Sequence, residues 1–281
     1  MKLDFHVHLT PPELSRDYRK LYGKEPYWAL LAESPINRFA DGEAVVEDIR
    51  QGGFQAAVVT GFSFQDQGLC RYVNDYTMEM AGKYPGELLG FMALSPKAPG
   101  LEAEFLRCLE GGLLGVGELF LTGQGVDPGN PEDLSLLMGL AREADVPIAI
   151  HSNEPVGHDY VGKVEVTPRE VGGIALAYPE NKLVLAHFGG GLPFYELMKE
   201  MRQGLSNVWY DTAAGVYLYD SAVFRVFREI GILDKILFGS DFPLLSVKRY
   251  EKYFAASGLT PEELEAVLGE NGRKLLKLRD F

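Results

Sequence analysis

The sequence of 281 residues predicts a closed (β/α)8 barrel, or TIM barrel. Eight short apolar runs recur along the chain, each too short for a helix, and several are apolar throughout, as strands covered on both faces are. Helix-like stretches separate these runs, mostly with short connections. The first strand is not followed by the glycine-rich phosphate loop that usually marks the competing fold, an open doubly wound sheet.

The first expected strand contains LDFHVHL, in which apolar residues alternate with Asp4, His6 and His8. Side chains on a strand alternate between two faces, so the two imidazoles should share one face, with Phe5 and Val7 on the other. The eight expected strands cover residues 2–8, 54–60, 88–94, 113–119, 147–151, 182–187, 208–212 and 236–241.

The expected helices begin at recognisable capping residues. Asp41 and Asp220 are candidate N-caps, and TPRE at 167–170 and TPEE at 260–263 have the pattern of a capping box. Pro131 opens another helix at a position that helices tolerate. The expected helices cover residues 42–51, 66–82, 101–110, 131–144, a segment from 167, 193–203, 221–231, 246–256 and 260–276.

One connection, residues 9–41, is unusually long. A loop of this length in a compact domain is usually a lid or a binding insert; the alternative is a helical excursion packed on the barrel wall. We find no repeat or linker, so we expect one domain over 1–281 with 9–41 as a candidate lid. The insert is rich in aromatic and arginine residues, namely Tyr18, Tyr22, Tyr27, Trp28, Phe39, Arg16, Arg19 and Arg38.

The composition indicates which kinds of molecule the protein could bind. The formal net charge is −13 and no run rich in lysine or arginine is present, which argues against nucleic acid or an anionic membrane as the main partner. No apolar run reaches the length of a membrane span. Cys70 and Cys108 indicate small buried thiols in a reducing compartment, and the chain enters its first strand at once, so a cytoplasmic protein is expected. We expect a small-molecule substrate; the sequence leaves a homo-oligomer open.

Polar residues collect at the ends of the expected strands, where barrel active sites lie. Each has an ordinary explanation by itself, such as a satisfied core histidine or a capping aspartate. Together they predict a metal site, because buried imidazoles and carboxylates are costly unless they are paired or bind a cation. Four of the five histidines are among them, and the set is His6, His8, Glu118, His151, His187 and Asp241. The fifth histidine, His158, could also reach the mouth of the barrel.

This set resembles that of the amidohydrolase superfamily of metal-dependent (β/α)8 enzymes, and the resemblance covers the whole chain. HFGGGLPF (187–194), NVWYDTAA (207–214) and ILFGSDFP (236–243) resemble more narrowly the amidohydrolase-2 branch. That branch is similar to aminocarboxymuconate-semialdehyde decarboxylase and related lactone or amide hydrolases. The resemblance therefore implies either hydrolysis or non-oxidative decarboxylation.

The resemblance leaves the number of metal ions open. In the decarboxylase-like pattern, the residue matching His187 is an acid/base, and one zinc is held by residues matching His6, His8, His151 and Asp241. GVGEL around Glu118 instead resembles a strand motif of TatD-type enzymes, in which a glutamate bridges two metals. We expect Zn²⁺ first, with Mn²⁺, Fe²⁺ or Co²⁺ as alternatives.

Our leading hypothesis is a hydrolase of a small amide, lactone or ester, which uses a metal-activated water and Asp241 as the proton carrier. The alternative is a metal-dependent decarboxylase of a small unsaturated or aromatic acid, with Arg38, Arg16 or His158 holding the carboxylate. A TatD-type nuclease is disfavoured by the net charge. A metal-binding barrel without catalysis is disfavoured by the retained Asp241.

Further residues are candidates for the pocket or for contacts with the metal-binding histidines. Tyr217 and Tyr219 follow the seventh strand and could line the pocket or pack on an outer loop. Asp211 and Asp4 could each orient a metal-binding histidine, which usually needs such a partner. The three glycines at 189–191 could let substrate approach the backbone, or could form a flexible loop.

Overall fold

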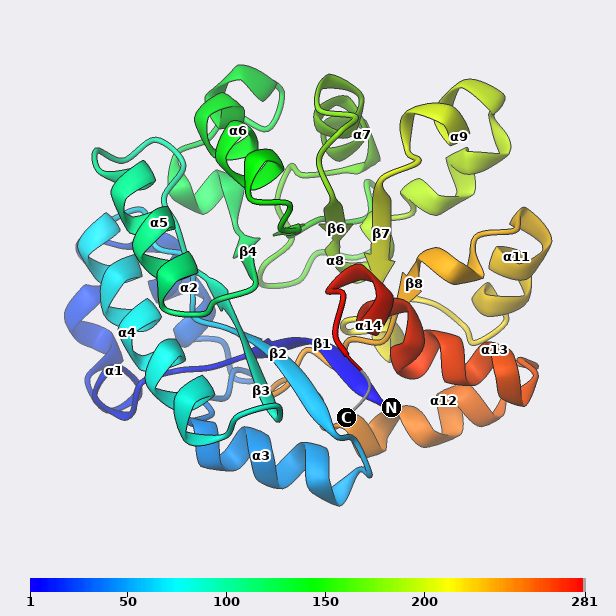
Figure 1. Cartoon of the computed structure of the whole chain (residues 1–281), viewed down its shortest axis with the longest axis horizontal. Coiled ribbons are helices and arrows are strands. Elements are labelled where there is room, and N and C mark those ends of the chain that lie inside the picture. The colour runs from blue at the N-terminus through cyan, green and yellow to red at the C-terminus, as the bar shows by residue number, and fades with distance from the viewer. Residues whose placement is uncertain (280–281) are drawn as a thin grey trace.

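Eight parallel strands form one sheet in sequence order in the computed structural model, which describes residues 1–279 (Figure 1). Hydrogen bonds from Phe5 N to Phe238 O and from His8 N to Phe242 O, both 2.7 Å, bring the last strand beside the first. The predicted (β/α)8 barrel is therefore confirmed. The strands are β1 (Leu3–His8), β2 (Ala56–Thr60), β3 (Leu88–Met92), β4 (Gly115–Leu119), β5 (Ile148–Ile150), β6 (Leu183–Leu185), β7 (Val208–Asp211) and β8 (Ile236–Leu237).

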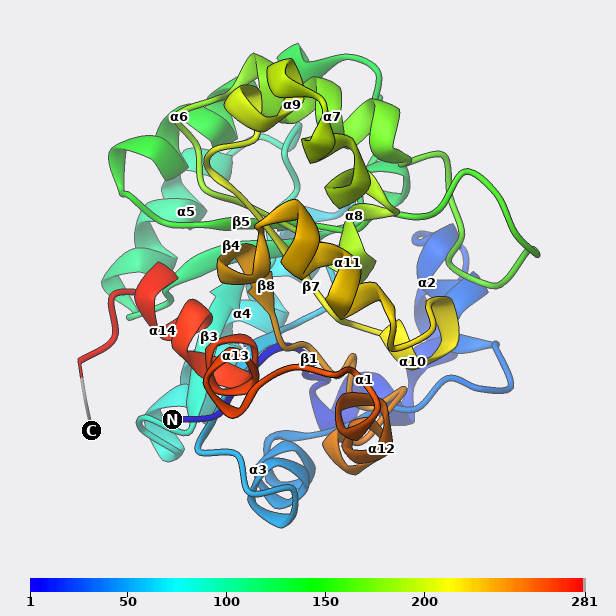
Figure 2. The same ribbon diagram turned by 90° about the vertical axis from the view of Figure 1, so that its right-hand side faces the viewer.

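Helices surround the strands (Figures 1 and 2). The Asp41 side chain accepts from Ala44 N at 2.9 Å, and both predicted capping boxes are present. None of the helices within residues 1–279 is long and apolar enough to cross a membrane. The α-helices around the barrel are α3 (Gly42–Gln51), α4 (Gln67–Lys83), α5 (Leu101–Glu110), α6 (Ser135–Glu143), α7 (Pro168–Ala177), α8 (Ala186–Gly189), α9 (Lys199–Gly204), α10 (Gly215–Leu218), α11 (Val223–Ile230), α12 (Glu251–Ala255), α13 (Pro261–Glu265) and α14 (Asn271–Leu275).

Several predicted helices are shorter or divided. Residues 131–144 begin as a 3₁₀ turn, η3 (Pro131–Leu134), and 193–203 divides at Met198 between η4 (Leu192–Leu197) and α9. Asp220 accepts from Ala222 N at 2.8 Å, but α11 starts only at Val223. The last predicted helix is interrupted by η7 (Ala266–Glu270). A Cβ on Gly269 would lie 2.0 Å from Met1 O, so the chain is in close contact with the N-terminus at this interruption.

The barrel interior is filled by strand side chains, including Leu3 and Phe5, and α14 adds Leu275 to this cluster. Val7 belongs instead to the larger cluster shared with the surrounding helices. The prediction that Phe5 and Val7 share a face is therefore wrong. Between Asp4 and Val7 the pairing with β2 contains one extra residue on β1, a bulge that changes the alternation of faces.

The insert after β1 folds into α1 (Pro12–Arg16), a 3₁₀ turn η1 (Tyr18–Leu21) and α2 (Pro26–Ala32). Trp28 is buried there and stacks on Phe39, with ring centroids 5.4 Å apart. Hydrogen bonds also connect the insert to the barrel. The Glu25 carboxylate accepts from Gln65 N and Asp66 N at 3.1 and 2.8 Å. The insert is thereby tied to the loop between β2 and α4.

Candidate metal centre

The six predicted metal-binding residues converge at one end of the barrel, in two groups of three. In the first group, His8 Nε2 lies 3.2 Å from His6 Nε2 and 3.1 Å from Asp241 Oδ1. In the second group, His151 Nδ1 lies 3.0 Å from Glu118 Oε1 and 3.2 Å from His187 Nε2. Within each group the candidate ligand atoms lie within 4.8 Å of one another.

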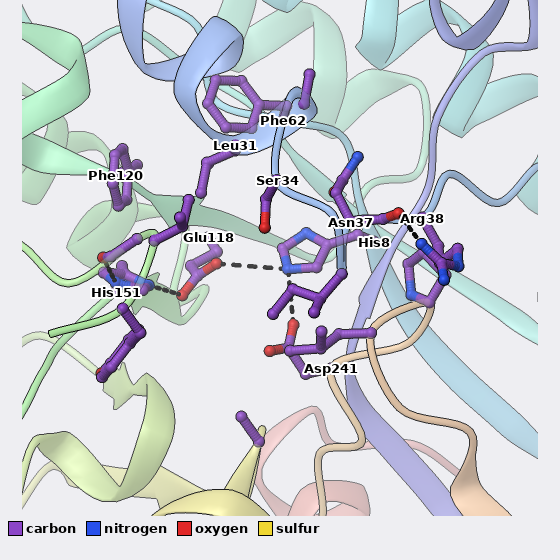
Figure 3. Close-up of a pocket in the computed structure, with 18 of the residues that line it drawn as sticks. His8, Leu31, Ser34, Asn37, Arg38, Phe62, Glu118, Phe120, His151 and Asp241 are labelled. Atoms are coloured by element: carbon purple, nitrogen blue, oxygen red, sulfur yellow. Dashed lines mark hydrogen bonds and ion pairs between the residues drawn. The ribbon is translucent and has the colours of Figure 1, made fainter. Parts of the chain in front are cut away.

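Glu118 joins the two groups. Its Oε1 faces the second group, while its Oε2 lies 3.5 Å from His6 Nε2 and 3.7 Å from His8 Nε2. Figure 3 shows Glu118 between His8 and His151. Two donor atoms that each lie about 2.0–2.2 Å from one Zn²⁺ ion are roughly 3–4 Å apart. The imidazole and carboxylate donors of both groups therefore fit a divalent transition metal, and Glu118 can contribute one oxygen to each group.

Hydrogen bonds fix which nitrogen of each buried imidazole faces the centre. His6 Nδ1 lies 2.8 Å from Asp211 Oδ2, and His187 Nδ1 lies 3.0 Å from Ala213 O. His151 Nε2 lies 3.1 Å from Gly162 O, and since a carbonyl only accepts, that nitrogen carries the hydrogen. The free nitrogens are thus Nε2 of His6 and His187 but Nδ1 of His151, all of which face the centre.

Local backbone features aim these side chains. An extra residue on β4 between Val116 and Leu119 accompanies the turn of Glu118 into the barrel mouth, as the β1 bulge does for His6. β6 and β8 end earlier than predicted. His187 and Asp241 follow them with φ of +58° and +66°, the left-handed region that non-glycine residues rarely adopt. Such backbone is concentrated at functional sites.

The charged side chains of the cluster strongly shift one another's pKa values. Burial alone would raise the pKa of Glu118, but the neighbouring His6 and His151 hold it well below the usual value. Burial alone would lower the pKa of His187, but its hydrogen bond to Glu118 and the nearby Asp241 carboxylate raise it to about 9. The cluster therefore favours positive charge among its imidazoles, whether from protons or from metal ions.

Asp211 makes the contact with a candidate metal-binding histidine that was predicted for it, whereas Asp4 does not. Asp4 Oδ1 accepts from His6 N at 3.2 Å and from Ser240 N at 2.9 Å, so it contacts backbone rather than an imidazole. The bulge in β1 explains this difference, because it breaks the alternation that would put Asp4 on the face of His6. Burial raises the pKa of Asp4 to about 7.

A cavity of about 620 Å³ opens above the cluster. Its walls include aromatic side chains from the insert and from the loops after β2 and β4, namely Trp28, Phe39, Phe62 and Phe120. Three predicted substrate-binding residues line it: Arg38, His158 and Tyr217. Arg16 and Tyr219 are not among its lining residues; Tyr219 packs on Phe188 and Phe194.

The glycines at 189–191 also lie outside the cavity lining. They are buried, all three have positive φ, and a Cβ on Gly190 would lie 2.1 Å from Asn153 O. Both expectations for them, close approach of substrate and a flexible loop, are therefore wrong. Glycine is required here by the left-handed backbone and by close packing.

Sequence reasoning missed several residues of the site. Asn153 and Tyr160 line the cavity, and Asn153 Nδ2 donates to Tyr160 Oη at 3.0 Å. Ser63 Oγ donates to the carbonyl oxygen of Glu118 at 2.6 Å and so supports the β4 bulge. Asn153 and Tyr160 lie in the polar run HSNEPVGHDY, which begins at His151 and could have revealed them. Only the histidines of this run were predicted to belong to the site.

The fold and the cluster define an enzyme class, metal-dependent catalysts built on a (β/α)8 barrel. The chain belongs to the Amidohydrolase family of the amidohydrolase-2 type, whose family profile matches residues 3–278, so the predicted branch is confirmed.

Similar proteins include two decarboxylases and a probable hydrolase. The chain is 26% identical over 259 residues to a gamma-resorcylate decarboxylase of Polaromonas sp. JS666, covering 74% of this chain and 76% of the relative. It superposes on a 5-carboxyvanillate decarboxylase of Novosphingobium aromaticivorans, in complex with manganese and 4-hydroxy-3-methoxy-5-nitrobenzoic acid, with a TM-score of 0.74, 17% identity and coverage of 99% and 96%. A probable 2-pyrone-4,6-dicarboxylic acid hydrolase of Acinetobacter baumannii superposes with a TM-score of 0.67, 17% identity and 99% coverage of both chains.

Proposed function

We propose that this protein is a divalent-metal-dependent, non-oxidative decarboxylase of a small aromatic or unsaturated carboxylic acid. The observation that carries the proposal is a cluster of imidazole and carboxylate donors at the floor of a cavity with aromatic walls. The similarity to gamma-resorcylate decarboxylase supports the same reaction class. The leading expectation from sequence, a hydrolase, therefore becomes the second candidate.

The residues proposed to hold the metal are the six of the cluster: His6, His8, Glu118, His151, His187 and Asp241. A bound divalent cation would supply positive charge to hold a substrate oxygen and to stabilise charge that develops on it. Manganese is as strong a candidate as zinc, since a structural neighbour contains manganese.

Loss of carbon dioxide breaks a carbon–carbon bond and leaves an electron pair on the ring carbon, which must then receive a proton. His187 is placed to deliver it, because its Nδ1 donates to Ala213 O while its other nitrogen faces the centre. Without metal in the cluster, Glu118 and Asp241 raise the pKa of His187 to about 9, so the imidazole carries the extra proton at neutral pH. His187 is thus the proposed acid of the one-ion arrangement, in which this nitrogen does not bind the metal, and Asp241 is the proposed second proton carrier.

One observation favours hydrolysis as the second candidate. The two oxygens of Glu118 face different groups of ligands, so the cluster has room for two ions. Paired metal ions are typical of enzymes that direct water at a phosphoryl or acyl centre.

The two candidates differ in the atoms taken from water. We would incubate the manganese-loaded protein with hydroxybenzoic acids and with simple lactones and amides, in D2O and in ¹⁸O-labelled water. Decarboxylation predicts released carbon dioxide and one deuterium at the vacated carbon, without ¹⁸O in the aromatic product. Ring opening of a lactone with ¹⁸O uptake, and no release of carbon dioxide from any acid, would reject the decarboxylase in favour of the hydrolase.

A further inference from the structure

Arg38 is the only lysine or arginine among the described residues that line the cavity. Its Nη1 donates to two backbone carbonyls of its own loop, Pro35 O at 3.1 Å and Asn37 O at 2.7 Å. Within residues 1–279 no carboxylate forms an ion pair with it, and its Nε and Nη2 have no hydrogen-bond partner. Nη1 therefore fixes the guanidinium to its own loop, while Nε and Nη2 are left to donate hydrogen bonds to a ligand.

The loop that carries Arg38 is anchored to the barrel. Its neighbour Phe39 stacks on the buried Trp28, whose Nε1 donates to Tyr18 O at 2.8 Å. Trp28 also packs edge-on against Phe62 from the loop after β2, at 5.3 Å between ring centroids. Arg38 is thus presented from a packed segment, which lowers the entropic cost of binding a ligand there.

Apolar side chains line the cavity that also includes Arg38, among them Leu31, Ile36 and Phe62. In Figure 3, Arg38 is on the opposite side of His8 from Glu118 and His151, while Leu31 and Phe62 are on the same side of His8 as Glu118. A ligand that reaches from the centre to Arg38 therefore occupies a cavity with many apolar side chains in its lining, which suits a ring or a conjugated chain.

We propose that Arg38 binds a second anionic group of the substrate, so that the substrate is an aromatic or unsaturated acid with a further carboxylate remote from the reacting one. This inference rests on the proposed function in that the reacting carboxylate lies at the metal centre. A guanidinium fork matches a carboxylate in two parallel hydrogen bonds, which an ammonium does not reproduce. In a protein of net charge −13, an anionic end of a ligand also needs such a local cation.

The test is calorimetric binding of two unreactive probes, benzoate and isophthalate, to the manganese-loaded protein. Wild type should bind isophthalate about 10-fold more tightly than benzoate, as expected for one added charge-assisted contact. Arg38→Gln should erase that preference while benzoate affinity stays unchanged, and Arg38→Lys should keep part of it. Arg16→Gln is the matched control, because Arg16 is an exposed arginine of the same insert that does not line the cavity.

Equal affinities in wild type, or a preference for isophthalate that survives in Arg38→Gln, would overturn the inference. An equal loss of both probes would also overturn it, since Arg38 would then bind the only carboxylate of a monoacid. The binding assay needs no turnover. If Arg38→Gln erases the preference but no acid releases carbon dioxide, the proposed function fails and the dicarboxylate site stands. If an acid is decarboxylated but Arg38→Gln binds both probes as wild type does, the dicarboxylate site fails and the proposed function stands.

Discussion

The carboxylate of Asp211 lies 2.8 Å from His6 Nδ1, and its other oxygen accepts from the backbone N–H of His187 at 3.0 Å. One buried side chain from β7 thus orients the imidazole of β1 and holds the backbone of the residue after β6. Such partners of metal-binding histidines fix the ring and raise its basicity.

Asp211→Asn should weaken manganese or zinc binding about 10- to 100-fold, because the amide can present its NH₂ to Nδ1 and disturb the tautomer of His6. Metal affinity is measured by competition with a chromophoric chelator. Asp220→Asn, an exposed aspartate beyond the same strand, is the control. Equal affinities of Asp211→Asn and wild type would contradict the orienting role.

In the two-ion arrangement of the second candidate, Glu118→Gln should reduce the metal content of the manganese-loaded protein from two ions to one, because a neutral amide is a poor bridge between cations. Native mass spectrometry counts the ions, and electron paramagnetic resonance reports coupling between two Mn²⁺ ions in wild type. Glu154→Gln, a glutamate of the loop after β5, is the control. A wild-type protein that takes up only one ion under saturating manganese would refute the two-ion arrangement.

Removal of metal should destabilise the protein. An ion that binds only the folded state at a concentration 100 times its dissociation constant adds about 2.7 kcal/mol to the free energy of unfolding. The melting temperature with and without a chelator measures this, and restoring manganese should restore it. In a variant with His6 and His8 both changed to Asn, the chelator should have a smaller effect; an undiminished effect would place the stabilising ion elsewhere.

The insert 9–41 is proposed to act as a lid, and Glu25 ties it to the barrel. Glu25→Gln retains one acceptor oxygen and leaves one backbone N–H of the 65–66 loop without its partner, at a cost of about 1–3 kcal/mol. We expect faster amide hydrogen exchange within the insert and little change in the barrel strands. Glu33→Gln, at an exposed site in the same insert, should leave exchange unchanged. Uniform acceleration over the whole chain would argue against a separate lid.

Glu104 provides a test of acid stability. Burial would raise its pKa, but hydrogen bonds from Arg107 and Asn74 lower it below the usual value. Its contribution to stability is therefore present above the pKa of the unfolded state, about 4.3, and is lost as the pH falls through the lower folded-state value. Glu104→Gln should cost about 2 kcal/mol at pH 7 and progressively less below pH 4, measured by urea unfolding. A loss of stability in Glu104→Gln that is the same at pH 7 and pH 3 would contradict this. The control is Glu180→Gln, which removes an exposed ion pair with Arg142.

The barrel and the ligand set could be predicted from sequence because both depend on local patterns. Short apolar strands alternate with capped helices, and strand ends collect at one rim whatever the details of packing. His6, His8, His151, His187 and Asp241 therefore converge as expected. The contact of Asp211 with His6 also followed from its position at the end of an apolar strand.

Only the tertiary structure decided how these side chains are aimed. The extra residues on β1 and β4 turn His6 and Glu118 toward the mouth, and they separate Asp4 from His6, because register depends on pairing with the neighbouring strand rather than on local sequence. The early ends of β6 and β8 reflect left-handed backbone at His187 and Asp241, which surrounding contacts must hold in place. Likewise, only the structure shows that Arg38 lines the cavity and Arg16 does not. This difference depends on how the insert packs on the barrel, a long-range contact that no local stretch of sequence contains.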